Sequence, residues 1–217
     1  MKSRGRKEPA VIVRRETIRE DPVAIRALED GRVQRGARSR RAIVDGLFDL
    51  VGEGVVEPTA YQVATRAGVG LRSVFRHFSD MESLFAAMDE RLLAEAAPIL
   101  LGAEPRGSLV RRARDLVLKR IELFELVAPY KRAANRKRAA SPFIESRHRA
   151  TVRQFRSDLL RWLPELSRSP ESLVDALDLV LSLESWDTLR SDRGLSRPRA
   201  HAAVERAVLA LVAELGS

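Results

Sequence analysis

The sequence of 217 residues contains no cysteine, which excludes disulfide bonds, thiolate metal sites and cysteine nucleophiles. It has only three histidines, His77, His148 and His201, and none lies near another possible ligand at metal-binding spacing. We therefore expect no metal and no other cofactor. Apolar runs long enough for a signal-peptide core or a membrane span are also missing, so we expect a cytoplasmic protein without a membrane partner.

Signatures of common catalytic sites are missing too. The chain has no nucleophile elbow and no Gly-rich phosphate loop followed by Lys and Ser or Thr. We therefore expect that the protein is not an enzyme. Its apolar content of 45% is enough for a sizeable core, and its length predicts a small module plus one larger domain.

Positive charge is abundant but unevenly placed, with a formal net charge of +9. Met1–Arg41 holds 13 basic and six acidic residues, and Lys131–Arg161 holds ten basic and two acidic ones. We predict that residues 1–38 form a flexible basic arm, apart from a short helix through Val23–Leu28, that is attracted to phosphate groups. A solubilising tail is the alternative. For the second basic stretch an anionic ligand, nearby DNA and a solvated face all remain open.

Two short helices joined by a glycine turn are predicted in the first third of the chain. Thr59 and Gln62 have the spacing of a capping box, in which each side chain satisfies a free backbone amide at a helix start. Gly68 is expected to end this helix, because glycine adopts the left-handed conformation at little cost. The next helix is predicted over Leu71–Phe78.

This second helix has two different faces. Val74 and Phe78 share one face, which we expect to be buried. The residues expected largely on the other face are Leu71, Arg72, Ser73, Arg76 and His77. Directly afterwards, Ser79 and Glu82 have the spacing of another capping box and predict a further helix.

An apolar stripe upstream supplies the third helix that two short helices need in order to fold. The stripe consists of Ile43, Leu47, Phe48 and Val51. Gly52 and Gly54 are expected to end this helix. Residues 39–84 therefore predict a three-helix unit in which one helix can enter a major groove while its neighbour crosses the DNA backbone.

Two short motifs of this unit are Ala67-Gly68-Val69 and Phe75-Arg76-His77-Phe78. In both, the sequence resembles the DNA-binding domain of TetR-family transcriptional regulators. The resemblance is close over residues 39–84, and the remainder is similar in length and helical pattern. It implies an all-α fold, with an N-terminal three-helix helix-turn-helix domain and a larger helical ligand-binding and dimerisation domain over residues 85–217.

The resemblance also implies the DNA contacts. By position these are Thr59, Gly70, Leu71, Arg72, Ser73, Phe75, Arg76 and His77, to which the basic arm adds Arg40. Arg72 is the preferred base reader because arginine is the commonest reader of guanine, with a solvated side chain as the alternative.

Three positions depart from the family pattern. Phe75 stands where a tyrosine that reaches a phosphate is common, Met81 where a lysine is common, and Gly70 where serine or threonine often caps the helix. These departures affect phosphate contacts rather than the fold.

The rest of the chain predicts helices separated by clusters of proline, glycine and serine. The predicted ranges are 81–101, 108–127, 130–140, 142–163, 170–190 and 196–215. Pro129 is expected to interrupt the chain between the second and third of these, and no alternating strand pattern is present.

The last two predicted helices carry more apolar surface than packing on one side needs. Their predicted dimer contacts are Leu177, Val180, Leu181, Val204, Val208 and Leu211. A homodimer through a four-helix bundle would bury this surface and place two recognition helices about 34–36 Å apart, to read a palindromic operator. Completion of the monomer core is the alternative.

In the family the larger domain binds a small-molecule effector, and occupancy changes the spacing of the recognition helices. The candidate pocket residues are Phe124, Tyr130, Phe143, Phe155, Trp162 and Trp186, with core packing as the alternative for each. The sequence therefore predicts a sequence-specific DNA-binding regulator, a repressor released by a small molecule. The alternative is a sequence-indifferent nucleic-acid-binding or architectural protein.

Overall fold

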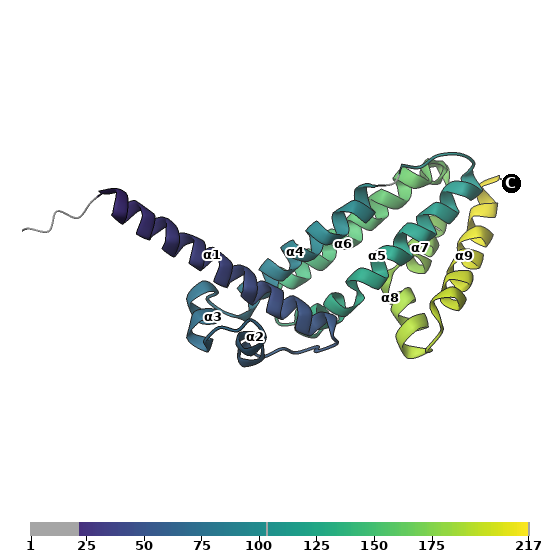
Figure 1. The fold of residues 1–217 in the computed structure, drawn as a ribbon. Helices are drawn as coiled ribbons and strands as arrows, with labels where there is room; N and C mark the ends of the chain where they lie inside the picture. Colours follow the sequence, from purple (N-terminus) through teal and green to yellow (C-terminus); the bar gives the residue numbers. More distant parts are fainter. Residues whose placement is uncertain (1–21, 103, 217) are drawn as a thin grey trace, which may run out of the picture. The chain divides into compact units, whose positions relative to one another are not determined.

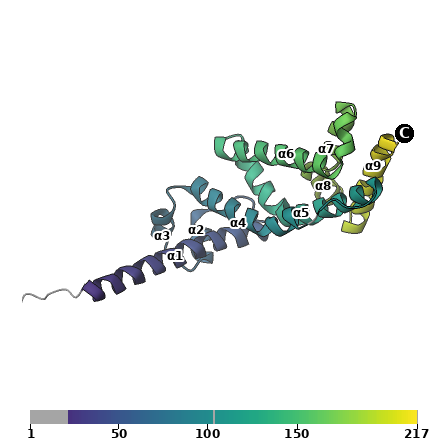
Figure 2. The ribbon, with the colours of Figure 1, turned by 90° about the horizontal axis from the view of Figure 1, so that it is seen from above.

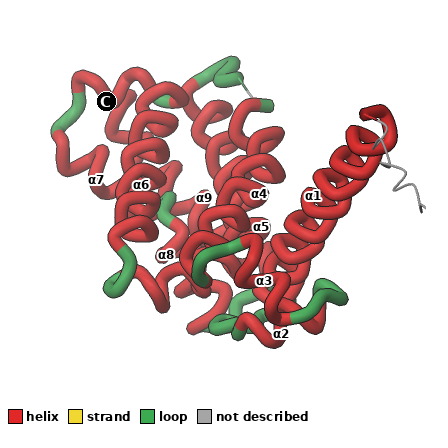
Figure 3. Tube along the Cα trace, turned by 90° about the vertical axis from the view of Figure 1, so that its left-hand side faces the viewer, coloured by secondary structure: helices red, strands yellow, loops and turns green. Residues whose placement is uncertain are grey.

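The computed structural model describes residues 22–102 and 104–216, with side chains over residues 33–102 and 104–215. Every regular element in these ranges is helical, which confirms the all-α prediction (Figure 3). The chain divides into two compact units, residues 1–38 and residues 39–217. Residues 1–21, which hold much of the predicted basic arm, lie outside the described residues.

Helix α1 (Pro22–Gly52) is a single helix of 31 residues, so the prediction of only a short helix over Val23–Leu28 was wrong. Nucleating a helix is costly, whereas extending one that is already formed costs little. The C-terminal part of α1 is fixed by the buried side chains of Ile43 and Leu47. Residues 22–38 can extend it because most of them are good helix formers, despite two glycines.

Helices α2 (Ala60–Arg66) and α3 (Leu71–His77) form the predicted pair. The capping box is confirmed. The backbone N–H of Gln62 donates to Thr59 Oγ1 over 3.2 Å, and the backbone N–H of Thr59 donates to Gln62 Oε1 over 2.9 Å. Gly68, in the turn, has φ +65°, the left-handed conformation predicted for it. The geometry of the turn therefore follows from its sequence.

Helix α4 (Met81–Leu101) has the predicted bounds but not the predicted cap. Asp80 is the N-cap residue, and its carboxylate accepts from the Ser83 amide over 2.7 Å, so the pairing of Ser79 with Glu82 was wrong. The Asp80 carboxylate is the better acceptor for a helix amide, because its negative charge also interacts favourably with the helix dipole. Glu82 instead accepts a hydrogen bond from the Ser141 hydroxyl.

Helix α5 (Leu109–Arg138) runs without interruption through Pro129, so the predicted break there was wrong. Proline costs a helix one hydrogen bond, but buried residues on both sides hold this segment in place. Val127 and Ala128 precede the proline, Tyr130 and Ala133 follow it, and all four are buried. Tertiary packing therefore outweighs the local preference.

Helix α6 (Pro142–Trp162) starts as predicted, with Ser141 Oγ accepting from the Ile144 amide over 3.2 Å. A 3₁₀ turn (Pro164–Arg168) follows it. The single helix predicted to reach Arg190 is instead divided into three elements. These are α7 (Glu171–Val180), α8 (Leu183–Asp187) and a π-helical turn (Thr188–Asp192).

The division has a local cause, because Ser182 caps α8 by accepting from the Ser185 amide over 3.1 Å. Gly194 then adopts φ +61°, and α9 (Arg197–Ala213) follows, ending in a 3₁₀ turn (Glu214–Gly216).

Within residues 39–217, α5 is the central helix and contacts α4, α6, α8 and α9. Both ribbon views show α2 and α3 at one end of this unit and α9 at the other (Figure 1; Figure 2). Two apolar cores fill it. The first core joins α1, α2, α3 and α4 to the C-terminal part of α5, and the second core joins the rest of α5 to α6, α7, α8 and α9. No helix in the described ranges is both long and apolar enough to cross a membrane.

Candidate nucleic-acid interface and ligand cavity

One face of α3 is open to solvent. Val74 and Phe78 are buried in the first core, as predicted. The exposed side chains are Leu71, Arg72, Phe75 and Arg76, and Leu71 and Phe75 keep 43% and 51% of their surface exposed. Two arginines therefore lie among large apolar side chains on a short helix that the core holds in place.

The start of α3 lacks a side-chain cap. Gly70 is the N-cap residue, no side chain bonds to the first turn, and the space around its Cα is open. Ser73 is half-buried and accepts a hydrogen bond from Arg76 Nη2 over 3.0 Å. That contact orients the Arg76 side chain along the helix.

His77 lies partly in the protein rather than on the open face. Its ring is half-buried, and Nε2 is buried without a hydrogen-bond partner among the described residues. Burial lowers the pKa of His77, and the positive charges of Arg76 and Arg40 lower it further. At neutral pH the imidazole is therefore uncharged, which does not favour an ionic contact with phosphate.

Two further predicted contacts lie beside this helix. Arg40 is exposed, and its guanidinium carbon is 4.8 Å from the centroid of the Phe78 ring. Thr59 is exposed at the start of α2, where its side chain is used in the capping box. Sequence analysis overlooked Tyr61, which is 70% exposed on α2. The signal in the sequence was an aromatic residue on the expected helix at a position that the apolar core does not need.

The predicted dimer residues are mostly inside the chain's own core. Leu177, Leu181, Val204 and Val208 are buried in the second core, so most of their surface completes the monomer. Of the six, Val180 and Leu211 stay partly exposed.

An apolar hollow nevertheless remains on the same elements. It lies between α7, α8, the π-helical turn and α9, and Leu179 on its edge is 68% exposed. Leu189, Ala203 and Ala207 also line it. Val180 and Val204, two of the six predicted dimer residues, line it as well, so part of the predicted apolar surface remains available.

The six predicted pocket aromatics do not surround one cavity. Tyr130 and Phe143 line one cavity, and Phe155 lines a second. Phe124, Trp162 and Trp186 line neither, because they are buried in the second core. The Trp186 indole donates to Glu125 Oε1 over 3.0 Å, which fixes it as a structural residue.

The two cavities adjoin each other. The first, of about 30 Å³, lies between α4, α5 and α6, and the second, of about 110 Å³, lies between α5, α6 and the α7–α8 segment. Lys131, Asn135 and His148 line both. Apolar side chains form most of the remaining walls, so the cavities suit a small ligand with one polar end.

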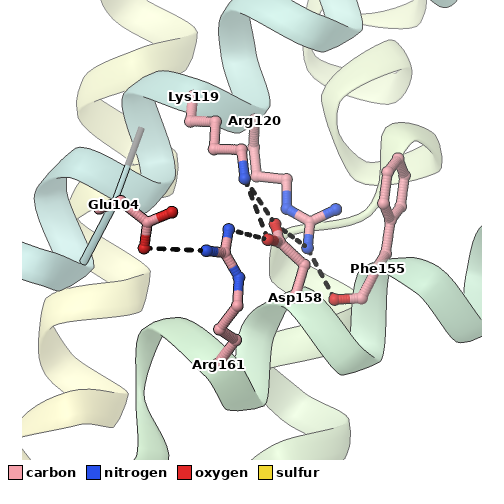
Figure 4. Close-up of polar contacts among 6 residues, drawn as sticks. All are labelled: Glu104, Lys119, Arg120, Phe155, Asp158 and Arg161. Carbon is pink, nitrogen blue, oxygen red and sulfur yellow. Dashed lines mark hydrogen bonds and ion pairs between the residues drawn. The ribbon is translucent and has the colours of Figure 1, made fainter. Parts of the chain in front are cut away.

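A buried ionic cluster joins α5 to α6 beside the second cavity (Figure 4). Lys119 Nζ is 3.0 Å from Asp158 Oδ1, and Arg120 Nη2 is 3.3 Å from Asp158 Oδ2. All three residues are buried, and Arg161 adds a third cation from the edge. Sequence analysis overlooked this cluster, although Lys119 and Arg120 interrupt an apolar run.

The cluster has consequences for ionisation. Burial by itself would raise the pKa of Asp158, but hydrogen bonds from Lys119 and Arg161 outweigh it and keep that pKa below its ordinary value. Burial lowers the pKa of Arg120 to about 10, still well above neutral pH. Two buried cations therefore share one carboxylate, and Asp158 contributes stability that is lost as the pH falls through its lowered pKa.

Arg120 also positions a wall of the second cavity. Its Nη2 donates to the Phe155 carbonyl oxygen over 2.7 Å, and its guanidinium lies 4.1 Å from the centroid of the Phe155 ring (Figure 4). The Nε and Nη1 atoms of Arg120 are buried without a hydrogen-bond partner among the described residues. The ionic cluster therefore holds Phe155 at the cavity edge.

The first cavity is in direct contact with the helix-turn-helix. Tyr130, which lines it, packs against Phe48 of α1 with ring centroids 4.3 Å apart. Arg91 of α4 lies over the other side of this contact, 3.9 Å from the Phe48 centroid, and pairs with Asp45 over 2.5 Å. The cavity wall and the helix-turn-helix therefore share one set of side chains.

Several solved structures have the same fold. A transcriptional regulator from Rhodococcus sp. RHA1 aligns with a TM-score of 0.63 and 21% identity over 81% of this chain and 96% of its own. A TetR-family regulator from Rhodococcus sp. aligns with a TM-score of 0.62 and 16% identity, over 80% of this chain and 98% of its own. One from Mesorhizobium loti aligns with a TM-score of 0.55 and 16% identity, over 82% of this chain and 97% of its own. No family model and no curated protein matches the sequence. The chain thus has the fold of TetR-family transcriptional regulators.

Proposed function

We propose that the protein is a sequence-specific DNA-binding transcriptional regulator, and that α3 is its recognition helix. The exposed face of α3 carries this proposal. A helix held by buried Val74 and Phe78 presents Arg72 and Arg76 outward, with Leu71 and Phe75 beside them. Arginine can read guanine edges in the major groove, and apolar side chains can contact thymine methyl groups.

The decisive experiment uses an operator selected from genomic fragments of the source organism. Arg72→Ala should weaken operator binding more than binding to random DNA, because base contacts carry the discrimination, at about 1–3 kcal/mol for a good pair. Arg111→Ala, an exposed arginine at the start of α5, is the matched control. Equal losses on operator and random DNA would exclude base reading by Arg72 and would favour the sequence-indifferent alternative.

The proposed regulator is a homodimer that uses the hollow at Leu179. Exposed apolar side chains beside α7 and α9 are costly in water, and a second copy related by a two-fold axis would cover them. Two recognition helices would then read two half-sites of a palindrome. In sedimentation, Leu179→Asp should shift the protein to a monomer, whereas Leu118→Asp, at another exposed leucine, should leave the dimer intact.

The basic arm would add phosphate contacts outside the groove. Arg35, Arg38 and Arg40 are exposed on α1. Each phosphate contact releases counterions and steepens the salt dependence of binding. Removal of the residues before Gly36 should therefore flatten this dependence; an unchanged slope would leave the segment without that role.

Regulation by a small molecule in the cavities completes the proposal. An effector changes DNA affinity only if it binds one arrangement of the helices better than another. The contact between Tyr130 and Phe48 offers a route, because one ring lines the first cavity and the other belongs to the helix-turn-helix. We assign repression in the cytoplasm, with release on effector binding.

A further inference from the structure

We propose that the effector is a small amphipathic carboxylate whose charged end binds Lys131, where the two cavities adjoin. This inference rests on the proposed function, because it names the chemistry of the effector. Three properties of the cavities support it: an ammonium without a hydrogen-bond or ion-pair partner among the described residues, cavity walls whose other basic groups are held by the protein's own carboxylates, and apolar surroundings of limited volume.

The ammonium of Lys131 is the cation that needs a partner. It is half-buried, lines both cavities, and forms no hydrogen bond or ion pair with any described residue. Of the other basic side chains in the cavity walls, Arg147 pairs with Asp89 over 2.8 Å, which leaves it little charge for a ligand. Arg120 is held in the ionic cluster by Asp158 and by the Phe155 carbonyl oxygen, and it shares Asp158 with Lys119, so it adds positive charge at the wall of the second cavity.

The acidic groups nearby do not replace a ligand. Asp178 pairs with Arg156 over 2.8 Å, a cation that it shares with Asp175, so its carboxylate is directed at Arg156 and forms no ion pair with Lys131. Glu184, on the α7–α8 side of the second cavity, is exposed and forms no ion pair in the described part of the chain. Water screens an exposed carboxylate, whereas a carboxylate inside the cavity would approach Lys131 directly.

An unpaired, half-buried ammonium is unfavourable in the ligand-free protein. Burial lowers the pKa of Lys131, and the nearby charge of Arg147 lowers it further, while Asp89 and Glu184 oppose the change. A bound carboxylate would supply the missing counter-charge and a charge-assisted hydrogen bond. Asn135 and His148, which also line both cavities, supply further polar groups.

The cavities limit the size and polarity of the rest of the ligand. The second cavity encloses about 110 Å³, and Val127, Phe155 and Leu183 are among its apolar walls. An apolar cavity of about 150 Å³ in another protein holds a benzene molecule, so the two adjoining cavities together limit the apolar part of the ligand to one ring or a short chain. A dianion or a sugar would leave polar groups against these walls.

Benzoate, benzamide and benzylamine test the proposal because they share a ring and differ in charge. Calorimetric titration should give benzoate a lower Kd than benzamide by about tenfold or more, with no binding of benzylamine. Hexanoate against hexanamide repeats the comparison with a chain. In Lys131→Met the preference for the acid should disappear, whereas Lys137→Met, six residues further along α5, should keep it. Lys131→Arg should restore it in part.

Several outcomes would overturn the inference. These are equal affinities for acid and amide, benzoate affinity unchanged in Lys131→Met, and no binding of either acid to the wild type. Circular dichroism checks that each variant is folded, and Lys131→Gln provides a second neutral side chain if Lys131→Met is not. Operator binding without ligand is measured in parallel: if it is present and the acids fail, only this inference falls, and if it is absent, the proposed function falls.

Discussion

The two cores of residues 39–217 differ in what they bury. The first core, around the helix-turn-helix, is apolar, and its ion pairs, such as Arg91 with Asp45, stay partly exposed. The second core lies against the buried cluster of Lys119, Arg120 and Asp158. Replacing such buried ions by apolar residues is often neutral or stabilising, so the cluster is weak evidence for stability and points toward a role in shaping the second cavity.

The difference matches the tasks proposed for the two regions. A recognition helix must hold one orientation, and close apolar packing gives it a single arrangement. A ligand site must keep space and polar groups available, and both are costly inside a protein. Four substitutions test this division, and they are ordered by the size of the expected effect.

Asp158→Asn should have the largest effect on stability. It leaves Lys119 and Arg120 buried without a counter-charge, so the free energy of unfolding should fall by about 3–5 kcal/mol. Urea unfolding measures the change. Asp115→Asn is the matched control, because its partner Arg111 is exposed, and such pairs contribute about 0–1 kcal/mol. Similar losses in the two variants would remove the distinction between the cores.

Gly46→Val tests the packing of the first core. A Cβ atom at Gly46 would lie 3.2 Å from the Ala67 amide nitrogen and 3.3 Å from the Val63 carbonyl oxygen, which is closer than ordinary contact. Valine should therefore force α1 away from α2, lower the unfolding free energy by about 1–3 kcal/mol and weaken operator binding. Gly70→Val, at a glycine with open space around it, should cost only the poorer N-cap preference of valine, about 1 kcal/mol, and should leave the packing of α1 on α2 unchanged.

His77→Gln should make stability less dependent on pH. The folded-state pKa of His77 is lowered, so the unfolded chain binds this proton more readily, and wild-type stability decreases as the pH falls below about 6.5. The variant loses that contribution. Urea unfolding between pH 5 and pH 7.5 should show a shallower decrease than in the wild type. Identical slopes would mean that burial beside Arg40 and Arg76 does not disfavour the protonated ring.

Gly70→Ser should have the smallest effect. A serine hydroxyl at the N-cap of α3 could accept a backbone amide that no side chain now satisfies. The expected gain is a few tenths of a kcal/mol, measured as a small rise in Tm. Discrimination between operator and random DNA should be kept, because the side chains on the exposed face of α3 are unchanged. A clear loss of stability would show that the first turn of α3 is held differently.

Sequence reasoning succeeded where the signal is local. The box at Thr59, the turn at Gly68 and the range of α4 follow from neighbouring residues, and the structure confirms them. It failed where distant packing decides. Pro129 stays within a helix because side chains from other elements bury the residues around it, and Leu177 is buried by the protomer's own helices.

The candidate site shows the same limit. The open face of α3 could be predicted, because the apolar residues Val74 and Phe78 have helical spacing and so mark the opposite, buried face. In the sequence Lys131 did not differ from its neighbours in the basic stretch. Only the fold places it at two cavities without a partner among the described residues. His77 was placed on the open side by its spacing, yet its Nε2 is buried. Side chains that pack between elements cannot be assigned from one helix alone.

Pro129 gives α5 a point at which the helix bends more easily than a helix without proline would. Proline has no N–H, so this turn of α5 lacks one backbone hydrogen bond in every state of the protein. Bending α5 at this turn therefore breaks fewer hydrogen bonds than bending it elsewhere. The missing bond would join the Pro129 nitrogen to the Glu125 carbonyl oxygen, so the weak turn lies directly before Tyr130, which lines the first cavity. A ligand in that cavity could therefore tilt the C-terminal part of α5 relative to the rest of the helix.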